Sequence, residues 1–329
     1  MQFWRVLHVG VKERRTCDAS AWALLASIAV LIGVLELRRP LVIEPASSIP
    51  FLIACAPVVA VALCYTYLRP RQNFAVMAIT LSQMLVFSMM GCVLQYLLAR
   101  EGGPMWDATL SGCDKALGVD WLSLVRTVDA HPVVAWTLGK AYQAMIPEAI
   151  AVILILGVLN RLDQLRVFLL AGMLCGAIII ILSPLFPSVS SYVFLGLTQA
   201  DFKHVNVVPG YSQLADFEAL RRGTFTVIHL PQLQGIIAFP SYHAGLATTN
   251  AWGFWNSRIE WLRWPGMLLA AATIISAPVF GGHYVVDVLG GIAIAVCSII
   301  AAKRLAYWRG ITLPLKASLS GHSEEAFAP

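Results

Sequence analysis

Two short stretches carry reactive side chains at the start of apolar segments. The first, "FPSYHAGLA", contains Ser241 and His243, and the second, "GGHYVVDVLGG", contains His283 and Asp287. His283 and Asp287 are four residues apart, so on a helix they lie on one face, one turn apart. An aspartate in that position accepts the Nδ1–H of the imidazole. The Nε2 atom is then free to act as a general base, a nucleophile or a metal ligand.

The first stretch adds a possible anion site. Pro240 suits the first turn of a helix, where its missing N–H is not needed. The free N–H groups of that turn, together with the Ser241 hydroxyl, predict a place for an anion beside His243. If the two helix starts face each other, they predict a phosphoryl-transfer site. One histidine would attack phosphorus and the other would protonate the leaving oxygen.

The composition indicates a membrane protein. Of 329 residues, 58% are hydrophobic and only 12% are charged, and the mean hydropathy is +0.74. Soluble domains carry about a quarter charged residues, so part of this apolar surface must face lipid. The net charge of +5 is spread between apolar runs, which argues against a nucleic-acid partner. The seven cysteines form no CxxC pattern, so we expect them to be packing residues.

The apolar runs predict an all-α, polytopic helical bundle of about eight transmembrane helices. The predicted spans are residues 20–37, 50–68, 74–98, 146–160, 165–186, 241–256, 262–280 and 283–302. Between the third and fourth spans, residues 101–131 mix acids with spaced apolar residues and tryptophans, which predicts one interfacial helix. The loop of residues 187–240 is long enough to be functional.

Three parts of the chain are expected. Residues 1–74 form a tail and two transmembrane helices, residues 75–305 form a six-helix catalytic bundle, and residues 306–329 form a cytoplasmic tail. Basic residues near the span ends predict that both termini are cytoplasmic, although Arg38 and Arg39 break this pattern. His243 and His283 then lie at the outer face of an inner or plasma membrane.

The two stretches resemble motifs of the type 2 phosphatidic acid phosphatase superfamily. "PSYH", followed about forty residues later by "HYVVD", is similar to the second and third of its three sequence blocks. The resemblance implies a helical bundle in which His283 forms a phosphohistidine, Asp287 orients it and His243 protonates the leaving group. It implies no metal or other cofactor. It also implies a lipid phosphate substrate and a water or alcohol acceptor.

The chain departs from the superfamily pattern at its cationic positions. The first block, Lys-x6-Arg-Pro, is missing, and Ser276-Ala277 stands where the third block has Ser-Arg. These gaps resemble the branch that includes inositol phosphorylceramide synthases and sphingomyelin synthases. The resemblance favours inositolphosphotransferase-like headgroup transfer between lipids, with hydrolysis of a lipid phosphate as the alternative. The residues expected to bind the phosphate are Ser241, Tyr242, Arg221, Arg222 and Lys140. Lys140 is alternatively expected to pair with Glu148.

Two other classes of function compete with this interpretation. A transporter or flippase would use His243, His283 and Asp287 as a proton relay, and it predicts repeated halves that the sequence does not display. A membrane metalloenzyme would use the same three residues as ligands, and it predicts loss of activity on chelation.

Overall fold

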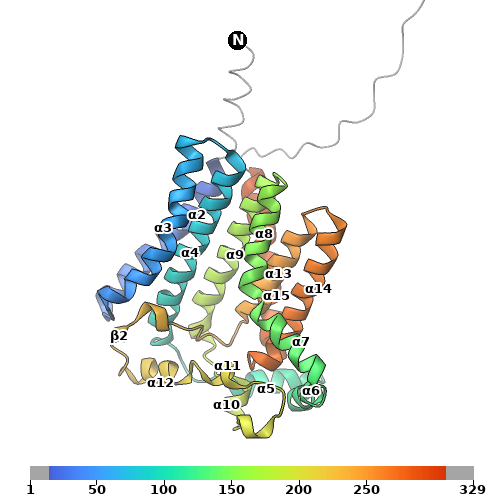
Figure 1. Ribbon diagram of the computed structural model, residues 1–329. Coiled ribbons are helices and arrows are strands. Elements are labelled where there is room, and N and C mark those ends of the chain that lie inside the picture. The colour runs from blue at the N-terminus through green and yellow to red at the C-terminus, as the bar shows by residue number, and fades with distance from the viewer. Residues whose placement is uncertain (1–14, 309–329) are drawn as a thin grey trace, which may run out of the picture.

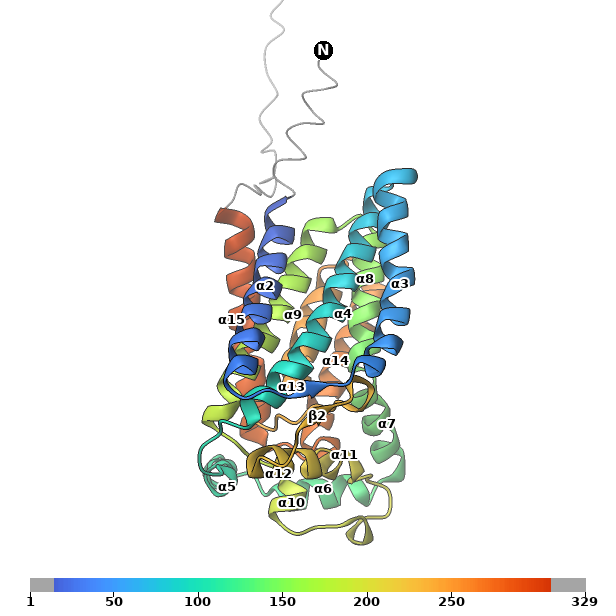
Figure 2. The same ribbon diagram turned by 90° about the vertical axis from the view of Figure 1, so that its left-hand side faces the viewer.

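The computed structural model describes residues 15–308 and contains a bundle of long helices with a layer of short elements across one end (Figures 1 and 2). Of the predicted tails, residues 1–14 and 309–329 lie outside the described residues, whereas residues 306–308, predicted to begin the C-terminal tail, belong to α15. The elements of the bundle are α2 (Arg15–Arg38), α3 (Ile49–Leu63), α4 (Gln72–Ala99), α7 (Pro132–Gln143), α8 (Met145–Val158), α9 (Leu162–Leu182), α13 (Tyr242–Trp255), α14 (Glu260–Phe280) and α15 (Val285–Trp308). The all-α class predicted from the sequence is confirmed.

Every predicted span falls on one of these helices. Among residues 15–308, six helices are long and apolar enough to cross a membrane: α2, α3 with its flanking turns, α4, α9, α14 and α15. A seventh span is possible if α7 and α8 count as one, although they are bent by 57° at their junction. Helix α13 has 14 residues, so at about 1.5 Å per residue it is shorter than a full hydrocarbon crossing.

The layer at one end is built from short elements: α5 (Asp107–Ala116), α6 (Trp121–Asp129), α10 (Ser191–Phe194), α11 (Val208–Tyr211), α12 (Leu214–Arg222), and the strands β1 (Val42–Ile43) and β2 (Val227–Ile228). Figures 1 and 2 show these elements at the end of the bundle opposite to the start of α2 and the end of α15. The described chain therefore begins and ends at the far end of the bundle from this layer.

The predicted single interfacial helix over residues 101–131 is wrong in detail. The segment forms two helices, α5 and α6, because the chain turns at Gly118, whose φ is +76°. This left-handed conformation costs glycine little and other residues more. Asp120 then starts α6, since its side chain accepts the N–H of Ser123. Each short helix can therefore make its own contacts with the bundle.

Residues 187–240 are folded against the end of the bundle. The strands β1 and β2 pair in parallel, with Val42 opposite Val227. Tyr96 of α4 donates its hydroxyl hydrogen to Asp216 at 2.7 Å. The side chain of Asp129, at the end of α6, accepts the backbone N–H groups of residues 203–205. The segment is thus held by α4, by α6 and by β1, which lies in the connection between α2 and α3.

Candidate active site

His283 lies just before α15, which begins at Val285. The prediction that it sits within the helix is therefore wrong by two residues. The first N–H groups of a helix lack partners inside it, and here carboxylates accept them. Asp114 of α5 accepts the N–H groups of Val285 and Val286, each at 2.9 Å, and Asp287 Oδ2 accepts the N–H of Tyr284 at 2.9 Å. These bonds fix the loop that carries His283.

The hydrogen bonds of His283 define the state of its ring. Its Nδ1 lies 2.9 Å from the carbonyl oxygen of Ala238 and 3.4 Å from Asp287 Oδ2. Both neighbours are acceptors, so Nδ1 carries the hydrogen and Nε2 of the neutral ring has a free lone pair. The carbonyl of Ala238 is thus the closer partner of Nδ1. The sequence predicts Asp287 alone as the acceptor of this hydrogen, and the structure divides that role between the two groups.

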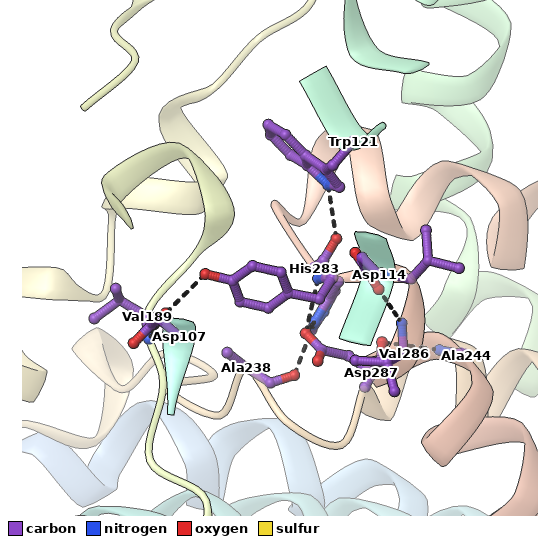
Figure 3. A network of polar contacts seen from close by, with 12 residues as sticks. Asp107, Asp114, Trp121, Val189, Ala238, Ala244, His283, Val286 and Asp287 are labelled. Atoms are coloured by element: carbon purple, nitrogen blue, oxygen red, sulfur yellow. Dashed lines mark hydrogen bonds and ion pairs between the residues drawn. The ribbon is translucent and has the colours of Figure 1, made fainter. Parts of the chain in front are cut away.

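Helices α5 and α6 buttress the same loop (Figure 3). Trp121 donates its indole N–H to the carbonyl oxygen of His283 at 2.9 Å. The Tyr284 hydroxyl donates to Asp107, which also accepts the N–H of Val189. Burial raises the pKa of Asp107 and that of Asp114 above the usual aspartate range, and the hydrogen bonds each accepts oppose this shift. The interfacial segment therefore positions the histidine loop.

His243 lies in the first turn of α13, which begins one residue earlier at Tyr242. Ser241 is the N-cap residue, and its hydroxyl accepts the N–H of Ala244 at 3.4 Å. Pro240 precedes the cap, so the prediction that it occupies the first turn is wrong. The N–H of Ser241 donates to the carbonyl oxygen of Asp287 at 3.0 Å, which joins the start of α13 to the start of α15.

The two histidine rings face one small space. Their centroids lie 6.0 Å apart with an interplanar angle of 58°. His243 also stacks on Tyr142 at the end of α7, with centroids 4.3 Å apart and planes 13° from parallel. Among the described residues, no side chain or backbone group forms a hydrogen bond with the ring nitrogens of His243 within the usual distance. A group held between the two rings could therefore contact both.

A cavity of about 250 Å³ opens onto both histidines. Its walls are predominantly apolar and come from α4, α9, α13, the α7–α8 junction and the 187–240 segment. The residues that line it include Phe87, Gly91, Gln95, Gly176, Ile179, Ser190, Ile237, Tyr142, Tyr242, His243 and His283. A cavity with apolar walls and a few polar groups at one end is typical of a site for an amphipathic small molecule.

The cations predicted to bind phosphate lie elsewhere. Arg221 donates to the carbonyl oxygen of Gly103 at 2.7 Å, and Arg222 pairs with Glu218 of the same helix at 3.0 Å. Lys140 is exposed on α7. No lysine or arginine among residues 19–306 lines the cavity. The structure thus brings Tyr242, His243, His283 and Asp287 together, with Ser241 buried behind them as a cap, and leaves the three cations outside.

Glu148 does not pair with Lys140. Its carboxylate is buried and contacts Thr273 Oγ1 at 2.6 Å and Asn250 Nδ2 at 3.3 Å. An acid inside a bundle needs partners of this kind. These two contacts hold α8 against α13 and α14.

Several residues of the site had no assigned role in the sequence. Asp107, Asp114 and Trp121 were visible only as part of an amphipathic segment, because nothing in their spacing links them to a histidine some 170 positions later. Tyr142 carries no motif at all. Ala238 contacts His283 only through its backbone carbonyl oxygen, so the identity of its side chain could not indicate this role.

Comparisons with known proteins give one match. A family model described as the PAP2 superfamily matches residues 108–301. Neither the curated proteins nor the solved structures gave a match. The matched segment begins in α5 and ends in α15, and it contains both histidine stretches. Within residues 19–306, no three histidine, cysteine, aspartate or glutamate side chains are grouped to hold a metal ion.

Proposed function

Since this chain belongs to the PAP2 superfamily, we propose that it is a membrane enzyme that transfers or hydrolyses the phosphate ester of a lipid through a phosphohistidine. The observation that carries the proposal is the pairing of His283, with its Nε2 lone pair free, and His243 across one space at the end of an apolar cavity. Superfamily membership supports phosphatase or phosphotransferase chemistry in general. The geometry of the site supports His283 and His243 as the catalytic residues of that chemistry.

The proposed reaction has two steps. Nε2 of His283 attacks phosphorus, the bond from phosphorus to the leaving oxygen breaks, and protonated His243 gives its proton to that oxygen. Water or an alcohol then attacks the phosphohistidine, His243 takes up its proton, and the phosphorus–nitrogen bond breaks. Asp287 and the carbonyl of Ala238 hold the ring of His283 throughout and stabilise the positive charge it gains.

The charge of the cavity supports headgroup transfer over monoester hydrolysis. A phosphate monoester carries up to two negative charges, and such groups are usually held by arginine or lysine. Because no such residue among 19–306 lines this cavity, a phosphodiester with one negative charge is the better substrate. We therefore propose a phospholipid headgroup, of the inositol phosphate type, as the transferred group. The acceptor would be a second lipid alcohol, or water when transfer fails.

The proposal also includes an orientation. We place both termini in the cytoplasm and the active site at the outer face. This is supported by the described chain, which starts and ends at the end of the bundle away from the histidines (Figure 1), and by the basic residues near the span ends.

A phosphoenzyme trap tests the mechanism. Purified protein is incubated with lipid substrate labelled on phosphorus, in the presence of EDTA, and quenched in alkali. We expect an acid-labile, alkali-stable label on the wild type and none on His283→Ala. We expect His243→Ala to be labelled more slowly. Label on His283→Ala, or turnover that EDTA abolishes, would contradict the proposal.

A further inference from the structure

Tyr142 lies at the centre of the candidate site without belonging to either histidine stretch. Its ring stacks on His243 at 4.3 Å and nearly in parallel, and it lines the cavity. Stacking on one face restricts the rotation of the imidazole, so Tyr142 holds His243 at a defined angle to His283. The stacked ring alone would serve this purpose, and it leaves the hydroxyl without an explanation.

The hydroxyl of Tyr142 lies close to the ring of His283, at Gly281, and Tyr142, Gly281 and His283 all line the cavity. A methyl group placed on Gly281 would lie 3.1 Å from this hydroxyl and 2.7 Å from Cδ2 of His283. Together with the carbonyl oxygen of Ala277 at 2.9 Å, these atoms pack too closely against Gly281 for any side chain there, so the hydroxyl and the His283 ring lie near each other. Among the residues the structure describes, none forms a hydrogen bond with the Tyr142 hydroxyl. A polar group so placed in a largely apolar cavity is expected to have a partner.

A phosphoryl group supplies that partner. Charge spreads over the non-bridging oxygens of phosphorus during transfer, and donors aimed at these oxygens lower the barrier. No lysine or arginine from residues 19–306 lines this cavity. Neutral hydrogen-bond donors must therefore stabilise the charge on the non-bridging oxygens. The hydroxyl of Ser190 lines the same cavity, 3.2 Å from where a methyl group on Gly282 would lie.

We infer that the Tyr142 hydroxyl donates a hydrogen bond to a non-bridging oxygen of the substrate phosphate as His283 attacks, so that Tyr142 is a catalytic residue of this enzyme. The inference depends on the proposed function. It assigns to a neutral phenol part of the role that cationic side chains have in the superfamily pattern. It also agrees with a phosphodiester of one negative charge as substrate.

The variant Tyr142→Phe separates the two roles of this side chain. It keeps the ring that stacks on His243 and removes only the hydroxyl. We expect kcat to fall about 10- to 100-fold, the loss usual for one hydrogen bond to a charged group, with KM nearly unchanged. Inhibition by orthovanadate, which mimics five-coordinate phosphorus, should weaken by a similar factor. Tyr67→Phe is the matched control, since Tyr67 is exposed in the turn after α3, and it should keep wild-type values.

Three outcomes would overturn the inference. These are a Tyr142→Phe enzyme with wild-type kcat and vanadate inhibition, a change confined to KM, and a loss of activity matched by a loss of folded protein in thermal melts. Tyr142→Leu, which removes the ring as well, should lose more activity than Tyr142→Phe. The wild-type phosphoenzyme is measured in the same series. Its absence would reject the proposed function, whereas its presence with an unaffected Tyr142→Phe rejects only the role of the hydroxyl.

Discussion

At the scale of single residues, the carboxylate of Asp287 contacts both the backbone of the loop before α15 and the ring of His283. Its Oδ2 accepts the N–H of Tyr284 at 2.9 Å and lies 3.4 Å from Nδ1 of His283. Its Oδ1 is buried and has no hydrogen-bond partner in the part of the chain that the structure describes. A buried negative charge with so few donors is costly, which fits a group that stabilises positive charge on His283 during the reaction.

Asp287→Asn should therefore fold and fail in catalysis. The amide oxygen can still accept the N–H of Tyr284, but the negative charge that we propose stabilises a positively charged His283 ring is lost. We expect kcat to fall about 10²- to 10⁴-fold, with the melting temperature within a few degrees of the wild type. Steady-state kinetics and the rate of phosphoenzyme formation measure this. Asp163→Asn, at a half-buried position in the first turn of α9, is the control. Full activity in Asp287→Asn would remove the aspartate from the mechanism.

At the scale of helices, the crossing of α13 and α15 sets the distance between the histidines. The backbones approach closely at Gly291, where an added Cβ would lie 2.2 Å from the carbonyl oxygen of Ser241. On the facing helix, a Cβ on Gly245 would lie 3.4 Å from the carbonyl oxygen of Gly291. Backbone atoms cannot move aside as side chains can, so this crossing depends on the missing side chain of Gly291.

Gly291→Ala should push the two helices apart. We expect a loss of about 1–3 kcal/mol in stability, as for other overpacked positions, and a fall in kcat of about 10- to 100-fold from misplaced histidines. The neighbouring Gly290→Ala is a close control, because its added Cβ would make ordinary contacts of 3.4–3.6 Å with Pro240 and Phe239. Thermal melts and steady-state kinetics measure the stability and the kcat of both variants. Equal effects of the two substitutions would refute this role for Gly291.

The same helices show how far the sequence could predict the structure. The long spans were predictable, because a chain in lipid must bury its backbone hydrogen bonds in helices of a set length. The start of α13 was recognisable from the stretch around Ser241, although Pro240 was expected in the first turn and instead precedes the cap. The buttressing of His283 by Asp114 and Trp121 was not predictable, since it joins residues some 170 positions apart. The bend between α7 and α8, which follows directly after Tyr142, has no signal in hydropathy.

At the scale of the whole molecule, the 187–240 segment forms part of the wall of the cavity that contains the histidines. Pro209, Gln213 and Ile237 of this segment line the cavity, so a substrate must pass it or enter between helices. Its main tether to the interfacial helices is Asp129, whose carboxylate accepts three consecutive N–H groups at 2.7–3.1 Å. Burial acts to raise the pKa of Asp129, but these three donors outweigh it and hold the pKa below the usual aspartate range.

The lowered pKa of Asp129 gives the tether a defined pH range. A depressed folded-state pKa means that the stabilisation is complete above the ordinary value of about 3.9 and is lost as the pH falls through the folded value. We therefore expect the segment to be equally protected at pH 5 and pH 7. Asp129→Asn should speed amide hydrogen exchange of peptides covering residues 203–205 about 10-fold at pH 7, after correction for intrinsic rates. Asp120→Asn removes the charge of a carboxylate that accepts an N–H at the other end of α6, and it should leave these peptides unchanged. If both variants exchange like the wild type, Asp129 does not hold the segment, and access to the histidines is controlled by the contacts of the segment with α4 instead.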